Sequence, residues 1–73
     1  ERDVQSLLRY LDLLLLVRKD AAHERWQRAV LRARTGQPAG AAEDLDWLIE
    51  HHPEGVDMNA VESLRRNLQN QGY

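Results

Sequence analysis

The residue types that could bind a metal ion gather at one place, where Glu50, His51 and His52 are followed by Glu54. Imidazole and carboxylate groups are zinc ligands, and a zinc site needs three or four that converge on the ion. Neighbouring residues of a helix point about 100° apart, so His51 and His52 cannot easily face one ion. A protonated imidazole in the last turn of a helix interacts favourably with the free carbonyl groups there. We therefore assign the histidines to a helix end and expect no metal and no cofactor.

The chain offers no residues for nucleophilic catalysis. It has no cysteine, so neither a Cys-His-Asp site nor a thiolate zinc site can form within it. Ser6 and Ser63 have no histidine at a suggestive spacing and no glycine-rich turn around them. The glycine patterns that bind dinucleotides or nucleoside triphosphates are also absent. We therefore expect a protein that is not an enzyme and has no catalytic residues of its own.

One segment is locally basic and the next is acidic. The basic segment could bind phosphate groups, but the acidic segment offers partners for ion pairs, and the net charge of −2 is no signature of nucleic-acid binding. Nucleic-acid binding through the basic segment is thus an alternative and not the expected function. The basic residues are Arg25, Arg28, Arg32 and Arg34, and the acidic ones are Glu43, Asp44, Asp46 and Glu50.

Helix-breaking residues divide the chain into four segments. Gly36 and Pro38 form one break, Pro53 and Gly55 form another, and a milder polar break lies at 18–20. No segment alternates like a strand, and each has apolar residues at helical spacing. Short linkers make neighbouring helices antiparallel. The predicted fold is all-α, with antiparallel helical hairpins in an array of four helices over about 3–17, 21–35, 38–51 and 58–69.

Several residues suit the expected helix ends. Asp3, Asp20 and Asp57 could each accept a hydrogen bond from a free backbone N–H at a helix start. Pro38 suits the first turn of a helix. Gly36 is expected to end the second helix in a left-handed conformation.

The first helix carries more apolar residues than one buried face needs. Each helix has an apolar stripe, but Leu13, Leu16 and Val17 project from the other side of the first helix, which should therefore be covered nearly all round. Trp47 lies off the apolar stripe of the third helix. We expect these four residues to form an interaction surface for protein, either a preceding domain of the same chain or another protein. The stripes are Val4, Leu7, Leu8, Leu11, Leu14 and Leu15; Ala22, Trp26, Ala29, Val30 and Ala33; Ala41, Ala42, Leu45, Leu48 and Ile49; and Met58, Val61, Leu64 and Leu68.

The chain has a faint internal repeat. The turns near residues 19 and 53 lie about 34 residues apart, which is the period of tetratricopeptide arrays. Gly36, Ala41 and Pro53 have the spacing of the glycine, alanine and proline that mark the inter-helix turn, the second helix and the repeat end in tetratricopeptide repeats. The stretches 24–31 and 36–45 more narrowly resemble the C-terminal repeat region of bacterial SirB-type proteins, and the resemblance covers roughly residues 7–68.

The resemblance implies how the helices belong to repeats. The second and third form one complete repeat, the first is the second helix of a preceding repeat, and the fourth opens or caps the next. Arg25, Arg28 and Arg32 occupy positions where an aromatic residue and leucines are expected, and Ala29 replaces the usual glycine. A standard concave peptide-binding groove is therefore not expected. The clamp for C-terminal carboxylates is also missing, because Trp26, Val30 and Ala33 lie near its polar positions.

SirB-type proteins carry a transglutaminase-like domain before the repeats. The resemblance therefore implies an accessory interaction domain, and any chemistry would lie in the preceding domain. The alternative is that this chain lines the active-site cleft of that domain. Because the chain begins with Glu1, we expect a fragment of a longer protein. When the fragment is isolated, we expect a homodimer through the side of the first helix from which Leu13, Leu16 and Val17 project. The longest apolar run, 13–17, is too short for a membrane span, and a cytoplasmic protein is expected.

One ion pair is expected between helices. In a hairpin that turns near residues 36 and 37, position 28 lies opposite about position 45. Arg28 and Asp44 flank the core positions Ala29 and Leu45, and both match the SirB-type pattern. We expect Arg28 and Asp44 to pair. If the pair is exposed, it contributes about 0–1 kcal/mol and sets the register of the helices more than their stability.

Overall fold

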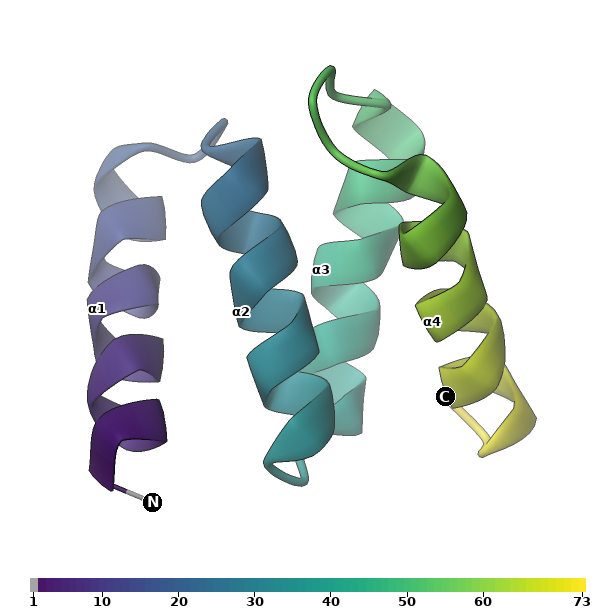
Figure 1. Cartoon of the computed structure of the whole chain (residues 1–73), viewed down its shortest axis with the longest axis horizontal. Helices are drawn as coiled ribbons and strands as arrows, with labels where there is room; N and C mark the ends of the chain where they lie inside the picture. The colour runs from purple at the N-terminus through teal and green to yellow at the C-terminus, as the bar shows by residue number, and fades with distance from the viewer. Residues whose placement is uncertain (1) are drawn as a thin grey trace.

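The computed structural model describes the backbone of residues 2–73 and the side chains of residues 3–73. Consecutive helices pack against one another, α1 on α2, α2 on α3 and α3 on α4, and they alternate in direction across the molecule (Figure 1). The expected all-α array of antiparallel hairpins is confirmed. The helices of this part of the chain are α1 Arg2–Val17, α2 Ala22–Arg34, α3 Pro38–His51 and α4 Met58–Asn70.

Gly36 makes the turn between α2 and α3 possible. It has a φ of +77°, which glycine adopts without the clash that a β-carbon causes. The backbone N–H of Gln37 donates to the carbonyl of Arg32 at 2.8 Å, which is the long hydrogen bond of a Schellman motif. The glycine therefore ends α2 in the left-handed conformation that the sequence suggests, and it turns the chain back along α3.

Pro38 begins α3 as expected, but only one of the three aspartates expected to cap a helix does so. Asp57 caps α4, because its side chain accepts a hydrogen bond from the N–H of Ala60 at 3.2 Å. The expectation for Asp20 is wrong: Ala21 precedes α2 and offers no side-chain hydrogen bond. Ala21 is buried and its N–H donates to Arg18, so Asp20 stays in the exposed turn. Asp3 is also not a cap, since α1 already includes it in its first turn.

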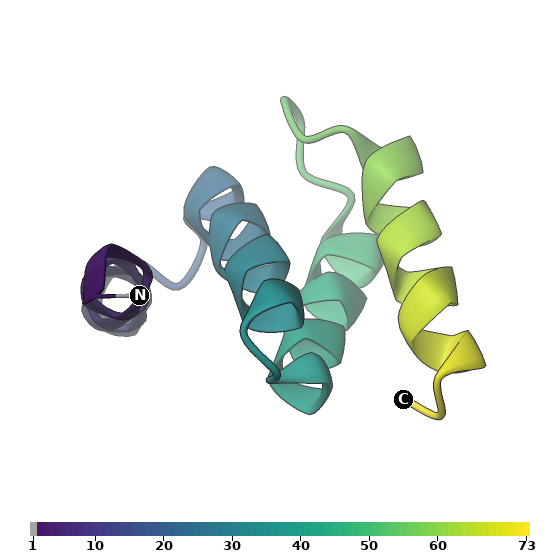
Figure 2. The same cartoon turned by 60° about the horizontal axis from the view of Figure 1, so that its bottom comes forward.

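The main hydrophobic cluster lies among α2, α3 and α4. Ala29 and Ala41 are fully buried, and their small side chains allow α2 and α3 to approach closely. The buried residues of α1 are Leu8, Leu11 and Leu15, which do not belong to this cluster. Figure 2 shows α1 set apart at one side of the array. The main cluster contains Ala29, Ala41, Ala42, Leu45, Leu48, Val61 and Leu68.

The two edges of the array differ in polarity. Every exposed residue of α4 is polar, whereas α1 exposes several large apolar side chains. A polar outer face is what a capping helix of a repeat array presents to water. The array therefore has a polar edge at α4 and an apolar edge at α1. None of the helices in residues 2–73 is both long enough and apolar enough to span a bilayer.

Candidate interaction surface

Four large apolar side chains lie together on the side of α1 that faces solvent. Their exposed fractions are 59% for Tyr10, 60% for Leu13, 71% for Leu16 and 82% for Val17. Tyr10, Leu13 and Val17 follow the three-and-four spacing that places residues on one side of a helix. We call these four residues the outer face of α1. They lie about opposite the buried Leu8, Leu11 and Leu15, as the 100° step per residue requires.

Trp47 does not contribute to this surface. It is half-buried and packs against the main hydrophobic cluster. The guanidinium of Arg25 lies over its ring, 4.3 Å from the ring centre, and the imidazole of His51 stacks on it at 4.0 Å. Contrary to the expectation, the structure brings together Leu13, Leu16 and Val17 but places Trp47 between helices α2 and α3. Trp47 lies off the apolar stripe but is covered by the guanidinium of Arg25. The spacing of apolar residues alone does not predict that a cation will cover a ring.

The expected ion pair between Arg28 and Asp44 is present, and its carboxylate is buried. Nε and Nη2 of Arg28 donate to the two carboxylate oxygens of Asp44 at 2.9 and 2.7 Å. Arg32 and Arg25 add contacts with the same carboxylate at 3.3 and 3.5 Å. Asp44 is only 2% exposed, so the low stabilisation given for an exposed pair does not apply to this one. The signal that could have revealed this is the spacing of the three arginines, which share one side of α2.

The surroundings of Arg25 and Arg28 shift their pKa values in opposite directions. Burial lowers the pKa of Arg25, whereas the hydrogen bonds with Asp44 raise the pKa of Arg28. Both guanidinium groups remain charged at neutral pH, because the ordinary pKa of arginine lies far above neutrality. Three of the four arginines of the basic segment thus serve contacts inside the molecule. This arrangement weakens the case for phosphate binding by α2.

A second carboxylate ties α1 to α2. Oδ1 of Asp12 accepts hydrogen bonds from Arg28 at 3.0 Å and from Arg32 at 3.4 Å. Between α3 and α4, Oδ1 of Asp46 accepts a hydrogen bond from Arg65 at 2.7 Å. Sequence reasoning missed both contacts. Asp12 and Asp46 lie 34 residues apart, so the repeat period already marks them as equivalent positions.

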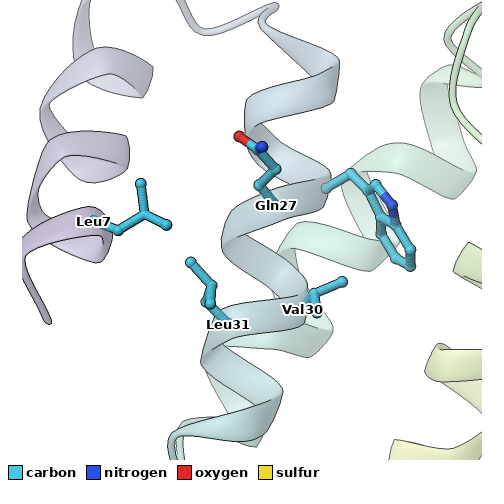
Figure 3. A pocket seen from close by; sticks show the side chains of 5 residues that line it. Leu7, Gln27, Val30 and Leu31 are labelled. Atoms are coloured by element: carbon cyan, nitrogen blue, oxygen red, sulfur yellow. The ribbon is translucent and has the colours of Figure 1, made fainter. Parts of the chain in front are cut away.

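A shallow hollow of about 240 Å³ lies where α1 meets α2. Leu7 reaches toward it from α1, and Gln27, Val30 and Leu31 line it from α2 (Figure 3). Trp26 also belongs to its lining, and Gln27 is its one polar residue. Among the described residues, those that line the hollow carry no basic side chain.

Both histidines lie at the end of α3, and His51 has structural partners. Nδ1 of His51 lies 2.8 Å from the carbonyl oxygen of Trp47, one helical turn earlier. His52 follows α3 in the left-handed region with a φ of 47°. In residues 2–73 no three histidine, aspartate or glutamate side chains are placed to hold a metal ion together.

Comparison with known proteins agrees with the helical array. The family model described as tetratricopeptide repeat matches residues 1–66. No curated protein and no solved structure matches the chain. Tetratricopeptide repeats are generally noncatalytic modules that mediate protein–protein interactions. The paired antiparallel helices, the 34-residue period and the match over residues 1–66 lead to one conclusion: the chain belongs to the tetratricopeptide repeat family and is a helical-repeat interaction module.

Proposed function

We propose that this module is noncatalytic and binds protein through the outer face of α1. The observation that carries the proposal is the exposure of Tyr10, Leu13, Leu16 and Val17 on one side of a helix whose opposite side is buried. Scattered apolar residues are normal on a protein surface, but a contiguous apolar patch is typical of an interface. Tyrosine is also enriched at interfaces, because its ring is apolar and its hydroxyl can stay in water.

The free energy gained by burying the outer face of α1 is small, which favours a partner in the same polypeptide. Full burial of one leucine or valine side chain is worth about 1.5–3 kcal/mol. Because Leu13, Leu16 and Val17 are 60–82% exposed, the remaining gain is about 3–6 kcal/mol for the three together. Free association costs about 4–15 kcal/mol. The face alone therefore supports weak binding between separate molecules, while a covalent link raises the effective concentration of a partner in the same polypeptide.

The proposed context is an accessory domain of a longer, cytoplasmic protein. The resemblance of residues 24–31 and 36–45 to SirB-type proteins supports a place after a transglutaminase-like domain. In that setting the outer face of α1 would dock on the preceding domain. When the chain is isolated, the same face is proposed to pair with a second copy.

Two alternatives make different predictions. If the outer face of α1 lines a catalytic cleft, the upstream part of the full gene must encode a cysteine, a histidine and an aspartate for that site. If α2 binds nucleic acid instead, the chain should retain duplex DNA or RNA at low salt, where electrostatic binding is strongest. The contacts of Arg25, Arg28 and Arg32 with Asp44 speak against the second alternative.

Sedimentation equilibrium tests the proposal with one substitution. Leu16→Glu places a charge on the outer face of α1, and it should remove self-association while circular dichroism shows unchanged helicity. Asn67→Glu adds the same charge to an exposed position of α4 and should leave self-association intact. Self-association that survives Leu16→Glu would show that another surface is used. If Leu16→Glu unfolds the chain, Leu16 belongs to the core and the face is misassigned.

The same substitution has a second use in a longer protein that contains this chain. There the outer face of α1 should couple the unfolding of the repeats to that of the preceding domain. Leu16→Glu should separate the two transitions in a calorimetric scan. A scan that does not change with this substitution would count against docking on the preceding domain.

A further inference from the structure

We infer that the outer face of α1 takes an antiparallel helix in the way that α3 takes α2, and that in the isolated chain the occupant of the face is α1 of a second copy. This inference rests on the proposed function, because it names the partner of the same surface. It adds the geometry of the pairing and the chemistry that selects the partner.

The first step is that α1 and α3 are equivalent helices. A shift of 34 residues places the buried Leu8, Leu11 and Leu15 on Ala42, Leu45 and Ile49. Ala42 and Leu45 belong to the main hydrophobic cluster, and Ile49 packs against it. The same shift places Asp12 on Asp46. Each of these carboxylates binds an arginine of the helix that follows, Arg28 or Arg32 of α2 and Arg65 of α4. The contact of α1 with α2 is therefore equivalent to the contact of α3 with α4.

The second step applies this shift to the outer face of α1. Tyr10, Leu13 and Val17 correspond to Asp44, Trp47 and His51. Two of these residues of α3 contact α2, since Asp44 binds three of its arginines and Trp47 lies beneath Arg25. His51 stacks on Trp47. Three of the four residues of the outer face thus correspond to positions at or next to the contact of α3 with its antiparallel neighbour α2, whereas Leu16 corresponds to the exposed Glu50.

The third step is the chemistry of the occupant. On α3, the buried carboxylate of Asp44 neutralises the arginines of α2, so a helix that carries arginines can pack there. On α1 the equivalent residue is Tyr10, and Leu13 and Val17 replace an aromatic and an imidazole ring. An arginine-bearing helix would find no carboxylate there, and burying an unpaired charge is costly. The face therefore selects a helix that presents apolar side chains.

A second copy supplies such a helix through its own α1. Within residues 2–73 the exposed residues of α4 are polar, so a head-to-tail stack of α4 on α1 would bury no matching apolar face. Pairing α1 with α1 about a twofold axis covers both apolar faces at once and closes the assembly. The two helices are antiparallel by symmetry when the axis is perpendicular to them, which is the arrangement of α2 on α3.

The centre of the exposed face sets the register. Leu13 lies in the middle of the face and is placed next to the twofold axis, so Tyr10 of one copy faces Leu16 of the other. In this register Val17 faces Arg9, whose aliphatic stem can cover it while the guanidinium stays in water.

Cysteine cross-linking tests the register, because the natural chain has no cysteine. A disulfide needs the two Cα atoms within about 7 Å. Leu13→Cys places both cysteines at the axis and should yield a disulfide dimer as the main species under mild oxidation. In Val17→Cys the two cysteines lie about 12 Å apart along the helices, so less than about a tenth of the chains should link. A mixture of Tyr10→Cys and Leu16→Cys should yield the mixed dimer. All four positions are exposed, and circular dichroism would check that each variant is folded.

The outcomes separate this inference from the proposed function. Linking at Leu13→Cys and in the mixture, without linking at Val17→Cys, supports the antiparallel pair. If Leu16→Glu removes self-association but Val17→Cys links as readily as Leu13→Cys, the face is an interface and the antiparallel register is wrong. If self-association survives Leu16→Glu, the proposed function fails first and the inference with it. A wild-type chain that stays monomeric at high micromolar concentration, with no variant linking, overturns the second copy as the occupant.

Discussion

Arg28 holds both carboxylate oxygens of Asp44, with its Nε 2.9 Å from one and its Nη2 2.7 Å from the other. A guanidinium and a carboxylate in this paired geometry form one of the stronger hydrogen-bonded contacts in proteins. Here the carboxylate is buried, and Arg25 and Arg32 also depend on it. The contact therefore joins α2 to α3 through one residue whose loss would leave three cations without their common partner.

Asp44→Asn should lower the free energy of unfolding by about 3 kcal/mol or more. Removing one partner of a buried ion pair leaves an uncompensated charge, which costs about 3–5 kcal/mol. Asp46→Asn is the matched control, because Asp46 pairs with Arg65 at an exposed position, where a pair contributes about 0–1 kcal/mol. Urea unfolding followed by circular dichroism measures both. Equal losses for the two variants would contradict a special role of the buried carboxylate.

Gly36→Ala should destabilise the chain by about 1–2 kcal/mol, because Gly36 has a φ of +77° and an alanine pays a steric cost in the left-handed region. The space around Gly36 is open, with no atom within 4 Å of an added β-carbon, so the loss comes from the backbone alone. Gly36→Asn should lose less, since asparagine tolerates this conformation better. Thermal unfolding compares the two. A loss for asparagine as large as that for alanine would argue against backbone conformation as the cause.

Asp57→Ala should destabilise the chain by about 0.5–2 kcal/mol, the usual effect of removing a helix cap. Its side chain accepts a hydrogen bond from the N–H of Ala60. Asp20→Ala serves as the control, because the side chain of Asp20 does not cap α2. It should change the stability by less than about 0.5 kcal/mol. The prediction fails if Asp20→Ala is the more damaging of the two.

Leu11→Ala and Leu16→Ala compare the same substitution on the two sides of α1. Leu11 is fully buried, and truncating a buried leucine costs about 2–5 kcal/mol. Leu16 is 71% exposed, so Leu16→Ala should change the stability of the monomer by no more than about 0.5 kcal/mol. The measurement is chemical unfolding at low concentration, where self-association does not contribute. A large loss for Leu16→Ala would place Leu16 in the core.

The helix bounds follow from local features and could be predicted closely. α3 spans Pro38–His51, as expected, because proline starts it and Pro53 prevents its continuation. The start of α2 could not be predicted from Asp20, because the chain direction there depends on the burial of Ala21 against the rest of the molecule. A cap residue indicates where a helix can begin, and tertiary packing decides where it does begin.

The burial of the candidate residues was harder to predict than their positions. Arg28 and Asp44 could be paired from the hairpin register, but the burial of Asp44 depends on Arg25 and Arg32 converging from the same side of α2. Trp47 likewise became half-buried because Arg25 covers its ring. The periodicity of apolar residues cannot predict burial that is caused by a charged side chain lying over another residue. The exposure of Leu13, Leu16 and Val17 could be anticipated, since only apolar side chains were involved.

The position of α1 outside the main hydrophobic cluster has a consequence for local opening. Helices that share few buried contacts with the rest of a protein open at lower free energy than the core. The amide hydrogens of α1 should therefore exchange with solvent faster than those of α3, through detachment of α1 from α2 while the other helices stay folded. A partner on the outer face of α1 would hold this helix in place, so slower exchange in α1 alone is the signature that binding would leave.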